Sequence, residues 1–304
     1  MIIISSLQEN KMINKWILSI ATLLSVATLP LFSEVIRTNS IQEILPAIEG
    51  NNPADTLVLF NIAEVLLDAE IELGTSPWRK LVRTKAPSAH DALTLLTAKK
   101  VPHRAVEANT PKLIQSLQEK GYPVMALTSR GRAEWYSTQI EGVDILTEKL
   151  LQKIGIDFTK SKLPNALSHL EETDYAPYYH AGILYACHHE KGEILTNIFK
   201  DVGYLPGKVV FVDDKRDSLE NVDAAMTQLG IPFVGFWYTR TAQDHRDFSP
   251  MVAHVQLAKL ILENKIMSNE EAKKLVEENY QNIDPNDYFQ ELLQSVDLSK
   301  ELVI

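Results

Sequence analysis

Residues 209–214 read Val-Val-Phe-Val-Asp-Asp, which is an apolar run followed directly by two carboxylates. A short β-branched run that ends in polar residues is typical of a buried strand. Ligands of open parallel sheets bind where the strands end at their carboxyl side, so Asp213 and Asp214 are candidate site residues. The alternative is that the two aspartates only form a turn or a helix cap.

Two other apolar runs end in the same way. Thr56–Phe60 is followed by Asn61, and Val124–Thr128 continues into Ser129 and Arg130. Helical patterns separate these strands, which predicts an α/β fold with a Rossmann-like parallel sheet flanked by helices. The three strand ends, together with Lys191 at the start of a helical stretch, are expected to meet at one edge of that sheet.

The remaining elements follow from turn and cap residues. Thr110 is expected to cap a helix that Gly121 ends, and Gly230 is expected to end another. Ser268 and Glu271 have the spacing of a capping box. The predicted elements are helices at 112–120, 132–140, 145–154, 164–172, 190–200 and 216–229, a hairpin at 178–186, a fourth strand at 233–238 and a helical tail at 254–298.

These elements predict three parts of the chain after an N-terminal segment. Residues 34–250 form the α/β domain, whose residues 34–55 are read as a mixed lead-in. An insert at about 141–185 interrupts the domain and forms a small cap. Residues 251–304 form a helical C-terminal segment packed on or beside the core.

The N-terminal segment has the features of a secretory signal. Lys11 and Lys15 precede the apolar run 16–32. This arrangement predicts a signal peptide over residues 1–33, cleaved after Ala27 or after Ser33, and an exported protein that is periplasmic or secreted. An uncleaved anchor helix is the alternative, in which case the membrane is met only through this segment.

The net charge and the cysteine count argue against a nucleic-acid partner and against an internal disulfide. The chain has 304 residues and a formal net charge of −10, which argues against nucleic acid as a partner. Cys187 is the only cysteine, so no disulfide forms within the chain, and we expect its side chain to pack as a small apolar group.

The ordered motifs resemble those of the HAD (haloacid-dehalogenase-like) phosphatase superfamily over residues 55–240. The four matching stretches, in the order of the family's motifs, are 60–65, 127–130, 190–192 and 211–217. Within that superfamily the chain is similar to a secreted bacterial group, the domain of unknown function 2608. The stretches 73–78 and 182–185 carry this second resemblance.

The resemblance implies a role for each matching position. Asn61 stands at the position of the aspartate nucleophile, and Ala63 at that of the acid/base. Thr128 and Ser129 would hydrogen-bond a phosphate oxygen, and Lys191 would pair with the phosphate. Mg²⁺ would be held by Asn61, Asp213 and Asp214, with Asp217 as a further candidate ligand.

The first motif departs from the family pattern. The neutral amide of Asn61 is a poor nucleophile, and Ala63 exchanges no proton, so catalysis and Mg²⁺ binding are both expected to be weakened. Glu64 is one residue from the acid/base position, where a strand would turn its side chain to the other face. Asp68 lies too far along the chain to replace the nucleophile.

The alternative for several of these residues is a purely structural role. Thr128 and Ser129 fit a helix cap, and a lone Lys191 fits a solvated helix start. The stretch 188–190, His-His-Glu, is read as a solvated loop, because neighbouring histidines rarely face one metal ion. The aromatic pairs at 135–136 and 237–238 are read as packing residues rather than as a stacking platform.

Three functions remain open. The first is a pseudo-phosphatase that binds a small phosphorylated or anionic ligand. The second is a Mg²⁺-dependent phosphomonoesterase with residual activity. The third is an exported interaction protein that binds a protein partner through the insert at 141–185 or through the helical tail.

Overall fold

The computed structural model describes residues 33–130, 142–164, 167, 177–187 and 189–298. Several predictions lie outside these residues: residues 1–32 of the expected signal peptide, the helix expected at 132–140, nearly all of the helix expected at 164–172, Trp135, Tyr136 and His188. Within the described part of the chain, no helix combines the length and the apolar character needed to cross a membrane.

The described residues form a seven-stranded sheet, which confirms the predicted α/β fold. All neighbouring strands are parallel except β6, which runs antiparallel to β7. The strands in spatial order are β1 (Ser33–Thr38), β9 (Phe233–Tyr238), β8 (Lys208–Asp213), β2 (Thr56–Phe60), β5 (Val124–Thr128), β7 (Ile183–Tyr185) and β6 (Tyr178–His180).

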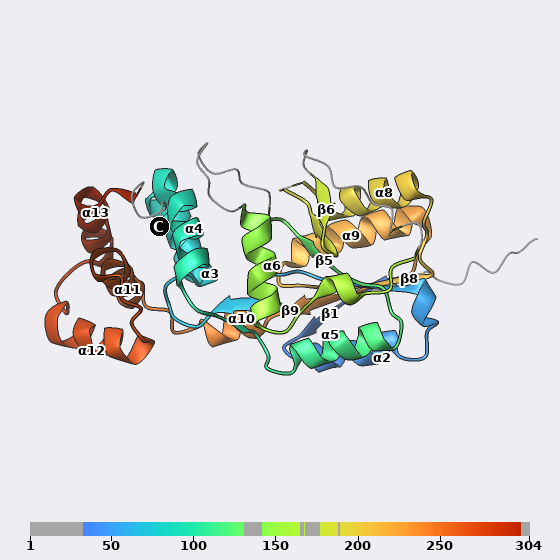
Figure 1. Ribbon diagram of the computed structural model, residues 1–304, viewed down its shortest axis with the longest axis horizontal. Helices are drawn as coiled ribbons and strands as arrows, with labels where there is room; N and C mark the ends of the chain where they lie inside the picture. The colour runs from blue at the N-terminus through green and yellow to red at the C-terminus, as the bar shows by residue number, and fades with distance from the viewer. Residues whose placement is uncertain (1–32, 131–141, 165–166, 168–176, 188, 299–304) are drawn as a thin grey trace, which may run out of the picture. The chain divides into compact units, whose positions relative to one another are not determined.

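Helices cover both faces of the sheet (Figure 1). On one face, Val58 and Phe60 of β2 pack with α2 (Leu45–Ile48) and α5 (Thr110–Glu119). On the other face, Leu57 and Leu59 pack with α8 (Lys191–Val202) and α9 (Arg216–Leu229). Because successive strand residues point to opposite faces, a strand buried on both sides is apolar throughout, as β2 is.

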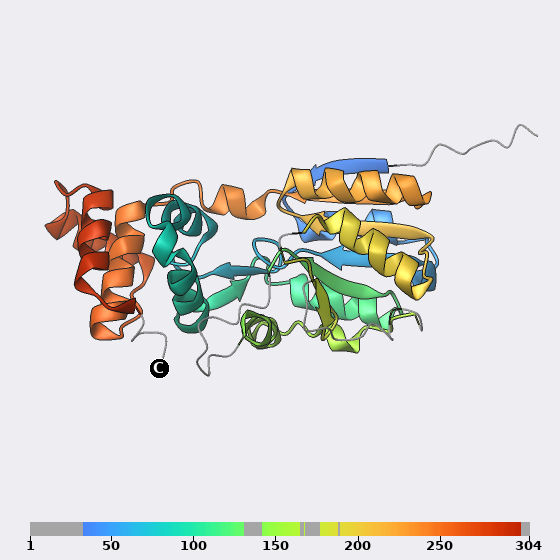
Figure 2. The same cartoon turned by 90° about the horizontal axis from the view of Figure 1, so that it is seen from above.

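The strand order reverses its direction between β2 and β8, and the carboxyl-end edge of the sheet between these two strands is called the crevice below. After β2 the chain adds β5 and then β7 on one side, and it then crosses to add β8 on the other side of β2. Such a reversal of direction opens a crevice at the carboxyl ends of the two strands that flank it, and ligands of open α/β sheets bind there. Figure 2 shows the sheet and its helices from above.

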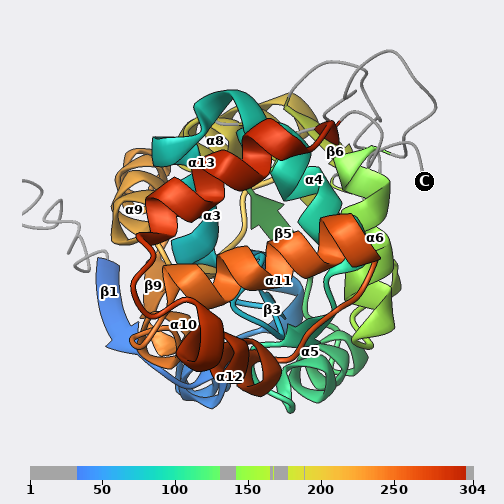
Figure 3. The same cartoon turned by 90° about the vertical axis from the view of Figure 1, so that its left-hand side faces the viewer.

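A second group of helices comes from two distant parts of the chain (Figure 3). One part is the connection from β2 to β5, which holds the ribbon of β3 (Leu67–Ala69) and β4 (His103–Ala105) with α3 (Ser76–Lys85) and α4 (His90–Lys100). The other part is the tail, with α10 (Arg240–Asp244), α11 (Pro250–Glu263), α12 (Asn269–Asn279) and α13 (Pro285–Ser295). Helix α11 contacts α3, α12 and α13. The capping box of Ser268 and Glu271 is confirmed at the start of α12.

Two local features differ from the sequence-based reading. Ser33–Thr38 belongs to an edge strand, β1, rather than to a mixed lead-in, and Ser33 itself pairs with Phe233. An edge strand buries little of its surface, so β1 lacks the apolar run that marks the central strands. Asn109, rather than Thr110, is the residue that precedes α5, and Thr110 begins the helix.

The interval 141–185 contributes directly to the sheet. It holds α6 (Val143–Lys153), a short 3₁₀ turn, η4 (Phe158–Lys160), and the β6–β7 hairpin, which was predicted and whose second strand pairs with β5. Removing this interval would therefore strip two strands from the sheet, so such a deletion is not a clean test of a partner-binding role.

Candidate functional site

The ends of β2, β5 and β8 lie side by side at the crevice. Phe60 pairs with Ala126 on one side and with Val212 on the other. Asn61 therefore follows β2 at the level where Asp213 ends β8, and Thr128 ends β5 close by. The register thus brings together the three strand ends that the sequence predicted to converge.

Lys191 joins this edge from the first turn of α8. Its Nζ lies 2.6 Å from Asp213 Oδ2 and 3.2 Å from Asn61 Oδ1, and both Lys191 and Asp213 are buried. Helix α8 can approach α9 closely because Gly192 has no side chain, since a Cβ there would lie 2.5 Å from the Asn221 carbonyl oxygen. A solvated role for Lys191 is therefore wrong, and a buried charge of this kind requires the partner that Asp213 supplies.

The orientation of the Asn61 amide follows from Lys191. An ammonium group only donates hydrogen bonds, so the amide oxygen of Asn61 faces it and the amide nitrogen faces away. That nitrogen donates to the Ala63 carbonyl oxygen at 3.1 Å and to Asp214 Oδ1 at 2.7 Å. The two amide N–H groups therefore occupy the space between the Ala63 carbonyl oxygen and Asp214 Oδ1. A cation coordinated by these two oxygen atoms would need the same space.

The surroundings of the Asp214 carboxyl group shift its pKa. Burial, the neighbouring Asp213, and Glu64 raise the pKa of Asp214 to about 7, and a hydrogen bond shared with Asp213 adds to the effect. The backbone of the same turn is held in place, because Lys215 N donates to Asp213 Oδ1 at 3.0 Å and Trp237 Nε1 donates to the Asp214 carbonyl at 3.1 Å. Protonation of Asp214 thus removes part of the negative charge that two adjacent aspartates would otherwise place here.

This pKa predicts a specific pH dependence of stability. The raised pKa means that the folded protein keeps a proton on Asp214 that the unfolded chain releases above about pH 4, so the contribution of Asp214 to stability falls as the pH rises toward about 7. Asp214→Asn removes this ionisation. We expect the melting temperature of the variant, relative to wild type, to be higher at pH 8 than at pH 5.

Asp217→Asn is the matched control, because Asp217 is exposed in the first turn of α9. Melting curves at pH 5 and pH 8 should give this control the same small difference from wild type at both values. If Asp214→Asn also shows no change between the two pH values, the pKa assignment is wrong.

Thr128 and Ser129 end β5 beside Asn61. Thr128 is buried, and its Oγ1 accepts a hydrogen bond from the Arg130 backbone N–H at 3.3 Å. The hydroxyl proton of Thr128 remains as a donor, for which no acceptor is found among the described residues. Ser129 is half-buried. The helix that Thr128 and Ser129 would cap falls at 132–140, outside the described residues.

Glu64 differs from its expected placement. Strand β2 ends at Phe60, and Glu64 adopts a left-handed backbone conformation with φ of 66°. Glu64 therefore does not continue the strand, and its side chain is not turned to the other face of the sheet as expected. Its carboxylate lies 3.2 Å from Arg79 Nη2, and its charge helps to raise the pKa of Asp214. Ala63 takes part only through its backbone.

The remaining candidates are either exposed or packed as structural residues. Asp217, His189 and Glu190 are exposed, so the solvated reading of the stretch 189–190 stands. Tyr238 is buried and donates to Glu107, as expected for a packing residue. Cys187 is half-buried and packs against the core, as expected for a small apolar side chain.

Trp237 and Asp68 take structural roles. The Trp237 ring lies beneath the guanidinium groups of Arg37 and Arg216, so this residue packs at the rim of the site. Asp68 is buried in the β3–β4 ribbon, where it pairs with His245 at 2.8 Å and with Arg104 at 3.4 Å. Asp68 therefore has its charged partners in and beside the ribbon rather than in the Lys191 cluster.

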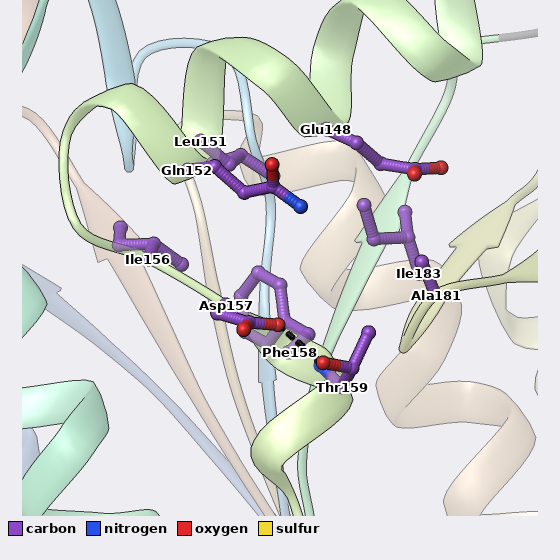
Figure 4. A pocket seen from close by; sticks show the side chains of 9 residues that line it. All are labelled: Glu148, Leu151, Gln152, Ile156, Asp157, Phe158, Thr159, Ala181 and Ile183. Atoms are coloured by element: carbon purple, nitrogen blue, oxygen red, sulfur yellow. Dashed lines mark hydrogen bonds between the residues drawn. The ribbon is translucent and has the colours of Figure 1, made fainter.

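Two hollows among the described residues lie away from the cluster. The hollow in Figure 4 lies between α6, η4 and the β6–β7 turn, with Glu148, Phe158 and Ile183 among its lining residues. Its volume of about 10 Å³ has room for about one water molecule. The other hollow, of about 490 Å³, lies between Lys85–Ala89 and the 290–298 stretch of the tail. The cluster is therefore defined by its side chains rather than by either of these hollows.

Comparison with known proteins places these residues inside a family. The family model described as "Protein of unknown function (DUF2608)" matches residues 37–273. A protein of Chlamydia trachomatis named "Putative outer membrane protein" is 25% identical over 260 residues, which cover 81% of this chain and 93% of that protein. A protein of Rickettsia bellii named "Uncharacterized protein" is 22% identical over 248 residues, which cover 74% of this chain and 83% of its own.

Proposed function

This chain belongs to the family described as protein of unknown function (DUF2608), and we propose that it is a HAD-like phosphatase-fold protein that binds a small phosphorylated or anionic ligand without hydrolysing it. The observation that carries the proposal is the buried Lys191 ammonium group, placed at the crevice between Asn61 and Asp213. A HAD phosphatase would have two carboxylates beside this lysine, whereas here one of the two groups is a neutral amide.

Anion binding is supported by the donors that converge on the crevice. The Lys191 ammonium group has three N–H donors, of which Asn61 and Asp213 take two. The third donor and the Thr128 hydroxyl can serve a phosphate or carboxylate oxygen. The raised pKa of Asp214 supports the same role, because a protonated Asp214 does not repel an anion.

Turnover is disfavoured by the same residues. Phosphoryl transfer in this superfamily requires a carboxylate that attacks phosphorus, and the Asn61 amide lacks both the charge and the nucleophilicity. The methyl group of Ala63 supplies no proton to a leaving group. The nucleophile and the acid/base of such an enzyme act as a unit. Loss of either group alone commonly lowers the rate by orders of magnitude.

The donor set does not fit the Mg²⁺ ion that the superfamily uses. Mg²⁺ prefers oxygen ligands in nearly octahedral geometry. Here the Asn61 amide nitrogen points between the Ala63 carbonyl and Asp214 Oδ1, and turning the amide over would set its N–H₂ group against the Lys191 ammonium. We therefore propose that Mg²⁺ binding is weak and that anion binding does not depend on it.

Thermal unfolding in the presence of phosphate tests this proposal. At a phosphate concentration of ten times the dissociation constant, binding adds about 1.4 kcal/mol to the free energy of unfolding. We expect an increase in melting temperature that is the same with EDTA as with Mg²⁺, and no increase with Mg²⁺ alone. A phosphate effect that appears only with Mg²⁺ would show that the cation belongs to the site, and no phosphate effect under either condition would contradict anion binding.

A Mg²⁺-dependent phosphomonoesterase with residual activity is the second candidate. It is favoured by the retained pair Asp213 and Asp214, since a carboxyl group with a pKa of about 7 can exchange protons near neutral pH. Hydrolysis of an aryl phosphate by wild-type protein, measured against the restored variant described in the Discussion, separates the two candidates.

We also propose that the protein is exported to the periplasm or secreted. The N-terminal lysines before the apolar run 16–32 support this, as do the names of the chlamydial relatives, which describe outer membrane proteins. Fractionation of cells that express the full chain tests the proposal. A shortened protein outside the cytoplasm is expected, and a full-length cytosolic product would contradict export.

A further inference from the structure

Glu64 adopts a backbone conformation that residues with a side chain rarely take. Its φ of 66° lies in the left-handed region, where the Cβ atom comes too close to the following carbonyl oxygen. Such a conformation persists only where the surrounding structure holds it, and such residues cluster at functional sites. Glu64 follows Asn61 by three positions, so the contacts that hold its backbone also bear on the site.

Three contacts hold the turn at Glu64. Its backbone N–H donates to the Leu67 carbonyl at 2.9 Å, and its carboxylate lies 3.2 Å from Arg79 Nη2. Its carbonyl oxygen accepts a hydrogen bond from Thr241 Oγ1 at 3.1 Å. The first two partners lie within the connection that follows β2, whereas Thr241 is a buried residue of α10, 177 positions away. Thr241 therefore ties this turn to a distant part of the chain.

The turn directs the Ala63 carbonyl at the Asn61 amide. Ala63 and Glu64 share one planar peptide unit, so the conformation of Glu64 fixes the direction of the Ala63 carbonyl relative to the turn. That carbonyl oxygen accepts from Asn61 Nδ2 at 3.1 Å, while Asn61 Oδ1 lies 3.2 Å from Lys191 Nζ. A turn that opened would release the amide, which could then set its N–H₂ group against the ammonium group. The contacts thus run without a gap from Thr241 to Lys191.

The same short segment also holds the second turn of the site. Trp237 precedes Thr241 by four positions, and its Nε1 donates to the Asp214 carbonyl at 3.1 Å. Asp214 Oδ1 is the other acceptor of the Asn61 amide, at 2.7 Å. Both acceptors of that amide therefore belong to turns that residues 237–241 hold by a hydrogen bond.

We propose that Thr241 is a positioning residue of the anion site, whose hydroxyl group fixes the Glu64 turn and so keeps the Asn61 amide oxygen on Lys191. With the amide oxygen in this place, the third N–H of Lys191 stays directed at the ligand. Thr241 contacts neither the ligand nor the ammonium group and acts only through the turn. The inference rests on the proposed function, because it explains how the affinity of that same site is set.

Phosphate binding measured by calorimetry tests this role. Thr241→Val keeps nearly the same volume and removes the donor to the Glu64 carbonyl. One hydrogen bond changes an equilibrium constant by about two- to tenfold, so we expect the phosphate dissociation constant to rise about fivefold. Thr241→Ser retains the hydroxyl group and should bind phosphate within about twofold of wild type.

Thr239→Val is the matched control. Thr239 is also buried in this segment, and its hydroxyl donates to the Thr38 carbonyl of β1 at 3.2 Å rather than to a turn of the site. The two valine variants should lower the melting temperature by similar amounts, but Thr239→Val should leave the dissociation constant within about twofold of wild type. If Thr241→Val loses stability but binds phosphate as wild type does, or if both variants weaken binding equally, Thr241 only supports the fold.

The side-chain amide protons of Asn61 give a measurement that needs no ligand. Both N–H groups are hydrogen-bonded, so their NMR signals should exchange slowly with solvent in wild type, and Asn61→Asp identifies them by their loss. Exchange should be at least about fivefold faster in Thr241→Val and unchanged in Thr241→Ser and Thr239→Val. Unchanged exchange in Thr241→Val would overturn the inference whether or not phosphate binds. Faster exchange in that variant, with no phosphate binding by wild type, would leave the positioning role in place and contradict the proposed function alone.

Glu64→Gly tests the turn in a chain that retains Thr241. Glycine adopts a positive φ without steric cost and keeps both backbone hydrogen bonds, while the carboxylate that pairs with Arg79 is lost. We expect the Asn61 amide protons to exchange as slowly as in wild type and phosphate to bind at least as tightly. Fast exchange in Glu64→Gly would assign the turn to the ion pair with Arg79 instead of Thr241 and would overturn the inference.

Discussion

Replacement of Asn61 and Ala63 together by aspartate is expected to turn the protein into a Mg²⁺-dependent phosphatase. The carboxylate introduced by Asn61→Asp would supply an anionic nucleophile and an oxygen ligand in place of the amide N–H₂ group that now lies between Ala63 O and Asp214 Oδ1. The carboxyl group introduced by Ala63→Asp would supply the proton that the native methyl group cannot. We expect hydrolysis of an aryl phosphate to rise by at least about 100-fold over wild type, since a general acid alone commonly contributes roughly 10²–10⁴-fold.

The measurement is a steady-state rate with and without EDTA, for wild type, both single variants and the double variant. Asn197→Asp is the matched control, because Asn197 is exposed on α8 and its replacement adds the same charge away from the crevice. A wild-type rate equal to that of the double variant would show that the natural protein is an active enzyme. A double variant that folds but neither hydrolyses the ester nor binds Mg²⁺ would contradict the assignment of this crevice to a phosphatase-like site.

Lys191→Met is expected to have the largest effect on stability. Asp213 is fully buried, and the ammonium group 2.6 Å away is its only charged partner among the described residues. Removal of one member of a buried ion pair costs roughly 3–5 kcal/mol, so the melting temperature should fall by about 10 °C or more. Lys200→Met, an exposed change at the other end of the same helix, should cost less than about 1 kcal/mol.

A compensating variant separates stability from binding. Lys191→Met combined with Asp213→Asn removes both buried charges and should recover most of the lost stability, because no unpaired ion remains. The double variant should still fail to bind phosphate, since the donor that holds the anion is absent. Phosphate binding that returns together with stability would mean that Lys191 only supports the fold.

The central strands and the convergence of the strand ends were predictable from sequence. Strands β2, β5 and β8 are buried on both faces, so each reads as an unbroken apolar run that ends at a polar residue. The convergence of Asn61, Thr128 and Asp213 then follows from the general geometry of parallel sheets. The position of Lys191 was predictable only from its order among the motifs, because a lysine at a helix start is usually solvated.

Other parts depend on contacts between segments that sequence patterns do not record. Strand β1 has one buried residue, Thr38, so its sequence has no apolar run from which the strand could be predicted. The orientation of the Asn61 amide is set by a lysine 130 positions away. Glu64 could not be placed without knowing that β2 ends before it and that its backbone turns to a positive φ. Arg79 carries no local signal, because only the packing of α3 brings it within 3.2 Å of the Glu64 carboxylate.

The central claim is that Lys191 and Thr128 hold an anion at a crevice where the Asn61 amide takes the place of a cation. A crystal structure of the wild-type protein soaked with both phosphate and Mg²⁺ tests it most directly. We expect phosphate within hydrogen-bonding distance of Lys191 Nζ and Thr128 Oγ1, with the Asn61 amide still between Ala63 O and Asp214 Oδ1. A metal ion coordinated by those two oxygen atoms, or a crevice without an anion beside Lys191, would contradict the claim.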